Sequence, residues 1–149
     1  TLFAHGNYLD PSKHAGLFGP NSSLVVCPRT HAAFGHLAHP WPAFRAAGVR
    51  VAVGTDGLSS NPDLDVLAEL RALRRQHPDV PGSVLLAMGT RDGADALGFG
   101  RECGTLAPGK SADAVAVPLP PGGGDPYDLL LAADAPAGGR RTMFRGEWR

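Results

Sequence analysis

Short apolar runs alternate with helix-forming segments along the first two thirds of the chain. Three runs rich in apolar and β-branched residues predict buried strands, and they lie at residues 1–4, 22–27 and 49–53. Short helices are expected at 11–17 and at 42–47, the second of which ends at Gly48, a residue that tolerates a left-handed C-terminal position. Strands and helices that alternate in such short cycles predict a parallel α/β architecture.

Further helices are expected after the third strand. Asn61 is a candidate N-cap, with Pro62 at the first helical position, and Leu67, Leu70 and Leu73 line one face of the helix that would follow. Ser83 and Thr90 are expected to cap two more short helices. By contrast, residues 29–41 show no periodicity and are rich in histidine and glycine, which predicts a functional loop.

The character of the sequence changes after Gly98. Strands are predicted at 112–117 and at 143–148, the latter turning at Gly146, and a connector rich in glycine and proline at 118–139 lies between them. We therefore divide the chain into an α/β domain at 1–100 and a small β subdomain, with the segment that leads into it, at 101–149.

Composition excludes several classes of protein. The 149 residues carry 14 Lys+Arg and 14 Asp+Glu, and this zero net charge argues against a nucleic-acid partner or a polybasic membrane anchor. No apolar run approaches the roughly 20 residues of a membrane span. The two cysteines, Cys27 and Cys103, lack metal-like spacing, which favours a reduced, cytoplasmic protein. Because an apolar run begins at Thr1, we expect the chain to be the C-terminal part of a longer protein.

Two polar residues follow predicted strands directly. His5 follows the first strand, and Asp56 follows the third after Gly54 and Thr55. Parallel strands would bring both residues to one edge of the sheet, where Asp56 could bind a cation and His5 could act as a general base or orient a water molecule. The alternatives are a turn aspartate that bonds its own backbone and a histidine satisfied by a loop carbonyl.

The segment after the second strand carries further candidates. Arg29 and His31 could reach polar groups of a substrate, whereas His36 and His39 are expected to be solvated loop residues. Cys27 lacks an identifiable base, so we expect a buried, small apolar side chain in place of a nucleophile.

Four segments, in this order and spacing, carry a resemblance to a known family. They are Ala-His-Gly-Asn-Tyr-Leu at 4–9, Cys-Pro-Arg-Thr-His at 27–31, Gly-Thr-Asp-Gly at 54–57 with Ser60 and Asn61, and Gly-Thr-Leu at 104–106 with Pro-Gly-Lys-Ser-Ala-Asp at 108–113. Together they resemble the metal-dependent amidohydrolase superfamily, in the branch that includes chlorohydrolases and cytosine, adenosine-type and aminodeoxyfutalosine deaminases.

The resemblance implies strands six to eight of a (β/α)₈ barrel, followed by part of a small β-sandwich subdomain. It also implies a divalent metal ion, with zinc expected, which Asp56 would bind while taking a proton from the attacking water that His5 orients and polarises. The implied reaction is deamination of a nitrogen heterocycle or nucleoside-like small molecule, or a related dechlorination. An amidase, an imidazolonepropionase-like enzyme and a non-catalytic α/β binding module are the alternatives, and a homo-oligomer is left open.

The family pattern is incomplete in this chain. The His-x-His pair of strand one and the histidine of strand five have no counterpart, and His31, His36 and His39 follow strand seven, so they cannot replace them. A catalytic zinc usually takes three protein ligands, more than one carboxylate supplies. We therefore expect the chain alone to be inactive, and its open sheet edge to favour aggregation or partial disorder.

Overall fold

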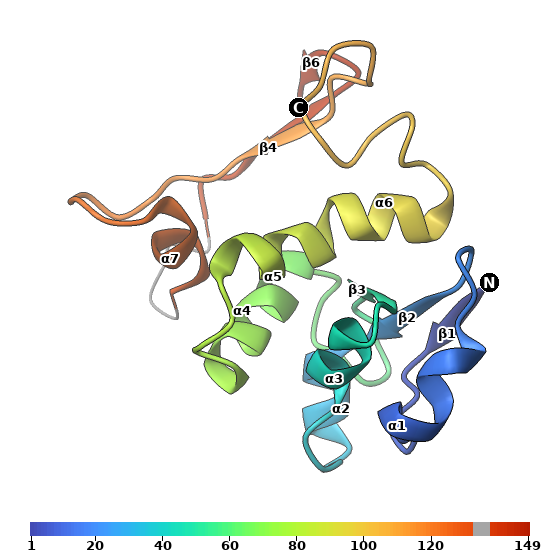
Figure 1. Ribbon diagram of the computed structural model, residues 1–149. Helices are drawn as coiled ribbons and strands as arrows, with labels where there is room; N and C mark the ends of the chain where they lie inside the picture. The colour runs from blue at the N-terminus through green and yellow to red at the C-terminus, as the bar shows by residue number, and fades with distance from the viewer. Residues whose placement is uncertain (133–137) are drawn as a thin grey trace.

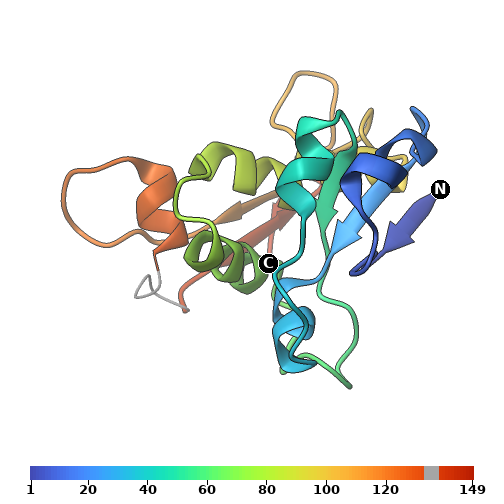
Figure 2. The ribbon, with the colours of Figure 1, turned by 60° about the horizontal axis from the view of Figure 1, so that its bottom comes forward.

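The chain forms a three-stranded parallel sheet at its N-terminal end, in a computed structural model that describes residues 1–132 and 138–149. Its strands are β1 (Leu2–Ala4), β2 (Ser23–Val26) and β3 (Arg50–Val53), which lie side by side in this order (Figures 1 and 2). Ala4 pairs with Val25, and Val26 pairs with Val53. The carboxyl ends of all three strands therefore meet at one edge of the sheet, as predicted.

Helices connect and follow these strands, which confirms the α/β alternation. They are α1 (Pro11–His14) with the 3₁₀ turn η1 (Ala15–Leu17), α2 (Pro28–Ala33), α3 (Trp41–Ala46), α4 (Val66–Gln76), α5 (Gly82–Gly89) and α6 (Arg91–Leu97). Gly48 follows α3 with a φ of 86°, in the left-handed conformation predicted for it.

The core lies between one face of the sheet and the helices α3, α4 and α5. Leu24 and Val51 from the sheet, Phe44 from α3 and Leu85 from α5 are all fully buried. Burial of one such side chain contributes about 1.5–3 kcal/mol to folding. This packing fixes the strands whose ends carry the candidate residues.

The first strand differs from the prediction of a buried strand. Leu2 and Phe3 are 44% and 39% exposed, because β1 pairs only with β2 in the described part of the chain. Phe3 still contacts the core through Phe18, at a ring-centroid distance of 4.9 Å. The open sheet edge expected from the sequence is therefore present at β1.

Residues 29–41 are not a continuous loop, contrary to the prediction. Pro28 occupies the first position of α2, where its fixed φ favours a helix, and Trp41 already belongs to α3. Arg29 and His31 therefore lie on a helix.

The predicted caps of α4 and α5 were also wrong. Asp65 caps α4 by accepting from the Leu67 and Ala68 backbone amides at 2.9 and 3.3 Å, whereas Asn61 is buried and bonded elsewhere. Ser83 lies inside α5, which Pro81 precedes. Thr90 precedes α6, but its hydroxyl makes no capping bond and donates instead to the Leu86 carbonyl at 2.7 Å. Gly98 ends α6 with a φ of 85°, as predicted.

A second, antiparallel sheet is formed by β4 (Ala114–Ala116), β5 (Arg141–Phe144) and β6 (Glu147–Trp148), and it stands apart from the helices in Figure 1. The turn at Arg145 and Gly146 has positive φ at both residues, 52° and 85°, which suits a tight hairpin. These strands confirm the elements predicted for the small β subdomain.

The predicted connector at 118–139 contains a helix that the sequence analysis missed. The helix α7 (Pro126–Leu131) begins at the Asp125 cap and packs beside α4 and α5 (Figure 1). Leu131 is 1% exposed, and the Leu130 carbonyl accepts a hydrogen bond of 3.1 Å from Arg71 Nε. The connector is therefore well packed at this point; residues 133–137 lie outside the described part.

The helices within residues 1–132 and 138–149 are all too short or too polar to cross a membrane.

Candidate active site

The carboxyl edge of the parallel sheet carries both strand-end candidates. His5 follows β1, and Asp56 lies three residues beyond the end of β3. Both adopt left-handed backbone conformations, with φ of 64° and 59°. Such conformations are strained for residues other than glycine, and they concentrate at functional sites when the surrounding structure holds them.

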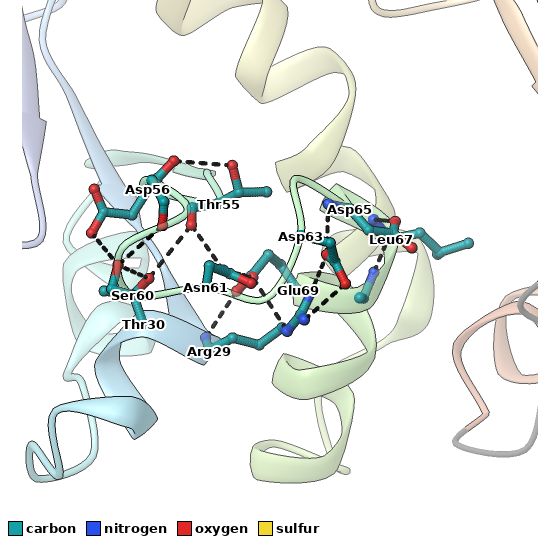
Figure 3. Close-up of polar contacts among 12 residues, drawn as sticks. Arg29, Thr30, Thr55, Asp56, Ser60, Asn61, Asp63, Asp65, Leu67 and Glu69 are labelled. Atoms are coloured by element: carbon teal, nitrogen blue, oxygen red, sulfur yellow. Dashed lines mark hydrogen bonds and ion pairs between the residues drawn. The ribbon is translucent and has the colours of Figure 1, made fainter.

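Asp56 presents an exposed carboxylate in the loop after β3 (Figure 3). Its Oδ2 accepts a hydrogen bond of 3.0 Å from Ser60 Oγ, while the described residues leave Oδ1 without a hydrogen bond. A carboxylate that is fixed through one oxygen and open at the other can accept a proton or bind a cation.

His5 is held through its backbone. Its amide donates to the Val25 carbonyl at 2.8 Å, and its carbonyl accepts from His39 Nε2 at 2.6 Å. Hydrogen bonds therefore hold the His5 backbone at both its amide and its carbonyl.

His36 and His39 lie in the loop between α2 and α3, as predicted, but both are partly buried and bonded within the chain instead of fully solvated. His39 is partly buried against the His5 carbonyl, and this burial lowers the pKa of His39 below its ordinary value. His36 Nδ1 lies 2.9 Å from the Tyr8 hydroxyl, and its ring lies 5.1 Å from that of His31. Contacts with the loop after β1 and with His31 therefore hold these partly buried rings.

Arg29 is engaged within the chain. Its guanidinium donates to both carboxylate oxygens of Asp63, at 2.7 and 3.1 Å, and Nε lies 3.7 Å from Glu69 Oε1. The hydrogen bonds from Arg29 are the largest cause that lowers the pKa of Asp63, to about 2. The ion pair gives Arg29 a structural partner, and its predicted substrate role stays a prediction.

His31 is also bonded on both ring nitrogens. Nδ1 lies 3.1 Å from Asn7 Oδ1, and Nε2 contacts the Leu37 carbonyl. These contacts tie α2 to the loop after β1, and a substrate role of His31 stays a prediction.

Cys27 is buried at the end of β2, in agreement with its interpretation as a small apolar side chain. Burial, with smaller contributions from the charges of Asp56 and Glu69, raises the pKa of Cys27 to about 11. The thiol is therefore neutral near pH 7 and poorly suited to act as a nucleophile.

Sequence reasoning missed the residues that hold the Asp56 loop. Ser60 bonds Asp56 directly, and the buried Glu69 on α4 bonds Asn61 (Figure 3). A signal was available, because Glu69 interrupts the apolar face of α4 formed with Val66 and Leu73. A charged residue on such a face requires buried partners.

A model of the amidohydrolase family matches residues 1–148 of the chain. The chain belongs to the amidohydrolase family. The resemblance drawn from the sequence motifs is thereby confirmed.

Relatives within the family include several deaminases. The chain is 37% identical over 126 residues to the 5-methylthioadenosine/S-adenosylhomocysteine deaminase of Moorella thermoacetica, an alignment that covers 80% of this chain and 29% of that protein. It is 32% identical over 135 residues to the aminodeoxyfutalosine deaminase of Nitratiruptor sp., which covers 88% of this chain and 32% of that protein. The chain thus spans about 30% of the length of these curated relatives.

The fold also matches a solved structure of an adenosine deaminase from Xanthomonas campestris with bound zinc. The TM-score is 0.84 at 27% identity, and the match covers 99% of this chain and 36% of that one. The α/β architecture predicted from the sequence is consistent with this family.

Asp56 is the candidate metal ligand of this site. Within residues 1–132 and 138–149, no group of three or more His, Cys, Asp and Glu side chains is arranged to hold a metal ion. Asp56 nevertheless fits a zinc ligand, because its exposed carboxylate has an open oxygen and zinc accepts carboxylate donors.

Proposed function

We propose that the whole protein is a metal-dependent hydrolase that deaminates a nucleoside-like small molecule. The names of its relatives support this substrate class, since they describe deaminases of 5-methylthioadenosine, S-adenosylhomocysteine and aminodeoxyfutalosine. The observation that carries the proposal is Asp56, a carboxylate held in a left-handed conformation by Ser60 at the carboxyl edge of the sheet, in a chain of the amidohydrolase family.

We place β1, β2 and β3 as strands six, seven and eight of a (β/α)₈ barrel, with residues 1–100 in the barrel and 101–149 in the segment that leads into the small β subdomain. Three adjacent parallel strands, their open edge at β1 and the partial coverage of longer relatives support this placement. In such barrels the active site lies at the carboxyl ends of the strands, where His5 and Asp56 are found.

Asp56 would hold the divalent ion, with zinc expected, through its open carboxylate oxygen. A bound divalent metal supplies acidity, because it lowers the pKa of a coordinated water molecule toward roughly 7. In the metal-loaded protein the Asp56 carboxylate would take a proton from the attacking water, and the His5 imidazole would orient that water by a hydrogen bond. The water oxygen would bond to the substrate carbon. The two protons of the water would end on the ring nitrogen and on the amino group, which would leave as ammonia while a carbonyl forms.

The remaining expectations stay predictions. A small-molecule substrate is supported by the relatives, and the absence of a nucleic-acid partner by the zero net charge. The cytoplasmic location expected from the sequence stays a prediction. Oligomeric state stays open.

The test uses the full-length, zinc-loaded protein and measures ammonia release from 5-methylthioadenosine, S-adenosylhomocysteine, adenosine and guanine, and chloride release from an atrazine-type chlorinated ring. We expect the nucleoside-like compounds to be the preferred substrates. Asp56→Asn should lower kcat about 10²- to 10⁴-fold, the range of a general base, whereas Asp79→Asn, an exposed control, should not. Full activity of the Asp56→Asn protein would refute the role of Asp56 as metal ligand and general base. Preference for guanine or the chlorinated ring would refute the nucleoside-like substrate class.

A further inference from the structure

The carboxylate of Glu69 lies beneath the Asp56 loop with no exposure to solvent. Its Oε1 accepts from Asn61 Nδ2 at 2.6 Å, and its Oε2 accepts from the Arg29 backbone amide at 2.8 Å. Burial raises the pKa of Glu69, while the bonds from Arg29 and Asn61 act in the opposite direction. A buried carboxylate is unfavourable unless it is paired and its oxygens are satisfied. These two bonds, with the Arg29 guanidinium 3.7 Å from Oε1, offset the cost of burying Glu69.

Asn61 connects Glu69 to the backbone beside Asp56. The same Nδ2 group that donates to Glu69 also donates to the Thr55 carbonyl, at 2.8 Å. Asn61 is 4% exposed, so this bond is shielded from water. Because Thr55 immediately precedes Asp56, the position of the buried carboxylate determines where the backbone enters the left-handed conformation at Asp56.

Thr30 provides a second connection to the same point. It follows Arg29, whose amide is bound by Glu69, and its hydroxyl lies 3.4 Å from the Thr55 carbonyl oxygen and 3.0 Å from Ser60 Oγ. Figure 3 shows the two connections converging on the loop from α2 and α4. All of these groups belong to the described chain, and Glu69, Asn61 and Thr30 are buried within it.

We propose that Glu69 is a positioning residue for Asp56, acting through Asn61 and the Thr55 carbonyl. The inference rests on the proposed function, in which Asp56 binds the metal and takes a proton. Glu69 itself touches neither the substrate nor the metal. Its effect is to hold the Thr55–Asp56 peptide, and misplacement of a reacting group by about 1 Å can reduce a rate on the order of 100-fold.

The test uses the full-length zinc-loaded protein and the variants Glu69→Gln, Asn61→Ala and their combination. The matched control is Asp92→Asn, which changes another buried carboxylate to an amide, in a residue 7% exposed and paired with Arg45 and Arg91. We expect Glu69→Gln and Asn61→Ala each to lower kcat per bound zinc about 10- to 100-fold with KM changed less than about threefold. The double variant should be slowed by less than the product of the two single effects, because both changes interrupt the connection through Asn61.

A merely structural role makes a different prediction. Glu69→Gln and Asp92→Asn would then lower the melting temperature alike and leave kcat per bound zinc unchanged, and that result would overturn the inference. If Glu69→Gln does not fold, Asn61→Ala interrupts the same connection from its other end and decides the question.

Crystal structures of the wild-type, Glu69→Gln or Asn61→Ala, and Asp92→Asn proteins separate this inference from the proposed function. A displaced Thr55–Asp56 peptide in the variants of the connection, but not in Asp92→Asn, supports positioning by Glu69. An unmoved peptide overturns it. The position of the peptide can be compared even if the wild-type protein releases no ammonia. Lack of ammonia release would refute the proposed function and leave the positioning by Glu69 to be decided by these structures.

Discussion

Ser60 Oγ donates a hydrogen bond of 3.0 Å to Asp56 Oδ2, and this contact closes the loop that follows β3. It fixes one carboxylate oxygen and turns the other toward open space. Ser60 is therefore the nearest support of the residue on which the proposed chemistry depends.

Replacement of Ser60 by alanine should slow the enzyme without unfolding it. A hydrogen bond to a charged group contributes about 1.5–3 kcal/mol, so we expect its loss in the transition state to lower the kcat of Ser60→Ala about 10- to 100-fold. The neighbouring exposed Ser59 provides the control, since Ser59→Ala should leave kcat unchanged. Equal kcat values for both variants, measured by ammonia release, would show that the contact does not support catalysis.

The Arg29–Asp63 ion pair should make stability depend on acidic pH. The pKa of Asp63 is about 2 in the folded chain, largely through the hydrogen bonds from Arg29, and near 3.9 when the chain is unfolded. The stabilisation is therefore complete above about pH 4 and is lost as the pH falls toward 2. The apparent urea midpoint of the metal-free wild-type protein should exceed that of Asp63→Asn at pH 5, and the two should converge near pH 2. A gap that stays constant from pH 5 to 2 would contradict this assignment.

Gly82 should resist substitution, because α7 packs directly against it. A Cβ at this position would lie 2.7 Å from Tyr127 Cβ and 3.4 Å from a methyl carbon of Leu131. We expect Gly82→Ala to destabilise the protein by about 1–3 kcal/mol in urea unfolding, through overpacking. Gly93→Ala in α6 is the matched control, since its Cβ would meet only the Met88 carbonyl at 3.6 Å. Alanine there should be neutral or stabilising by about 0.5–1 kcal/mol. Equal free energies of unfolding for Gly82→Ala and Gly93→Ala would show that α7 does not pack tightly against Gly82.

Cys27 should react slowly with alkylating reagents while the protein is folded. Its side chain is buried and its pKa is raised to about 11, so little thiolate is present at pH 8. Mass spectrometry after treatment with iodoacetamide should show Cys27 modified more than about tenfold more slowly than in urea. Modification at the unfolded rate in the native protein would contradict the buried environment.

The sequence was most informative where the signal is local. The β-branched run at 49–53 and the turn at Gly54–Gly57 predicted β3 and placed Asp56 at its end, and the spacing of turn residues predicted β5 and β6. These elements are specified by neighbouring residues, so a single sequence is sufficient to locate them.

Other features depend on contacts between distant segments. Arg29 and Asp63 are 34 residues apart, and only the packing of α2 beside α4 brings them together. Asn61 has the sequence signature of a cap, yet the buried Glu69 engages it and leaves capping to Asp65. The start of α7 has a local sequence signal, an Asp125 cap followed by Pro126 at the first helical position. The surrounding glycines and prolines instead favoured the prediction of an irregular connector.

The most direct test of the account is a crystal structure of the full-length protein with zinc bound. We predict one carboxylate oxygen of Asp56 at about 2.0–2.2 Å from the ion, with the His5 imidazole facing the same cavity. A fully ligated zinc ion that Asp56 does not touch, or a His5 ring directed away from it, would contradict the account.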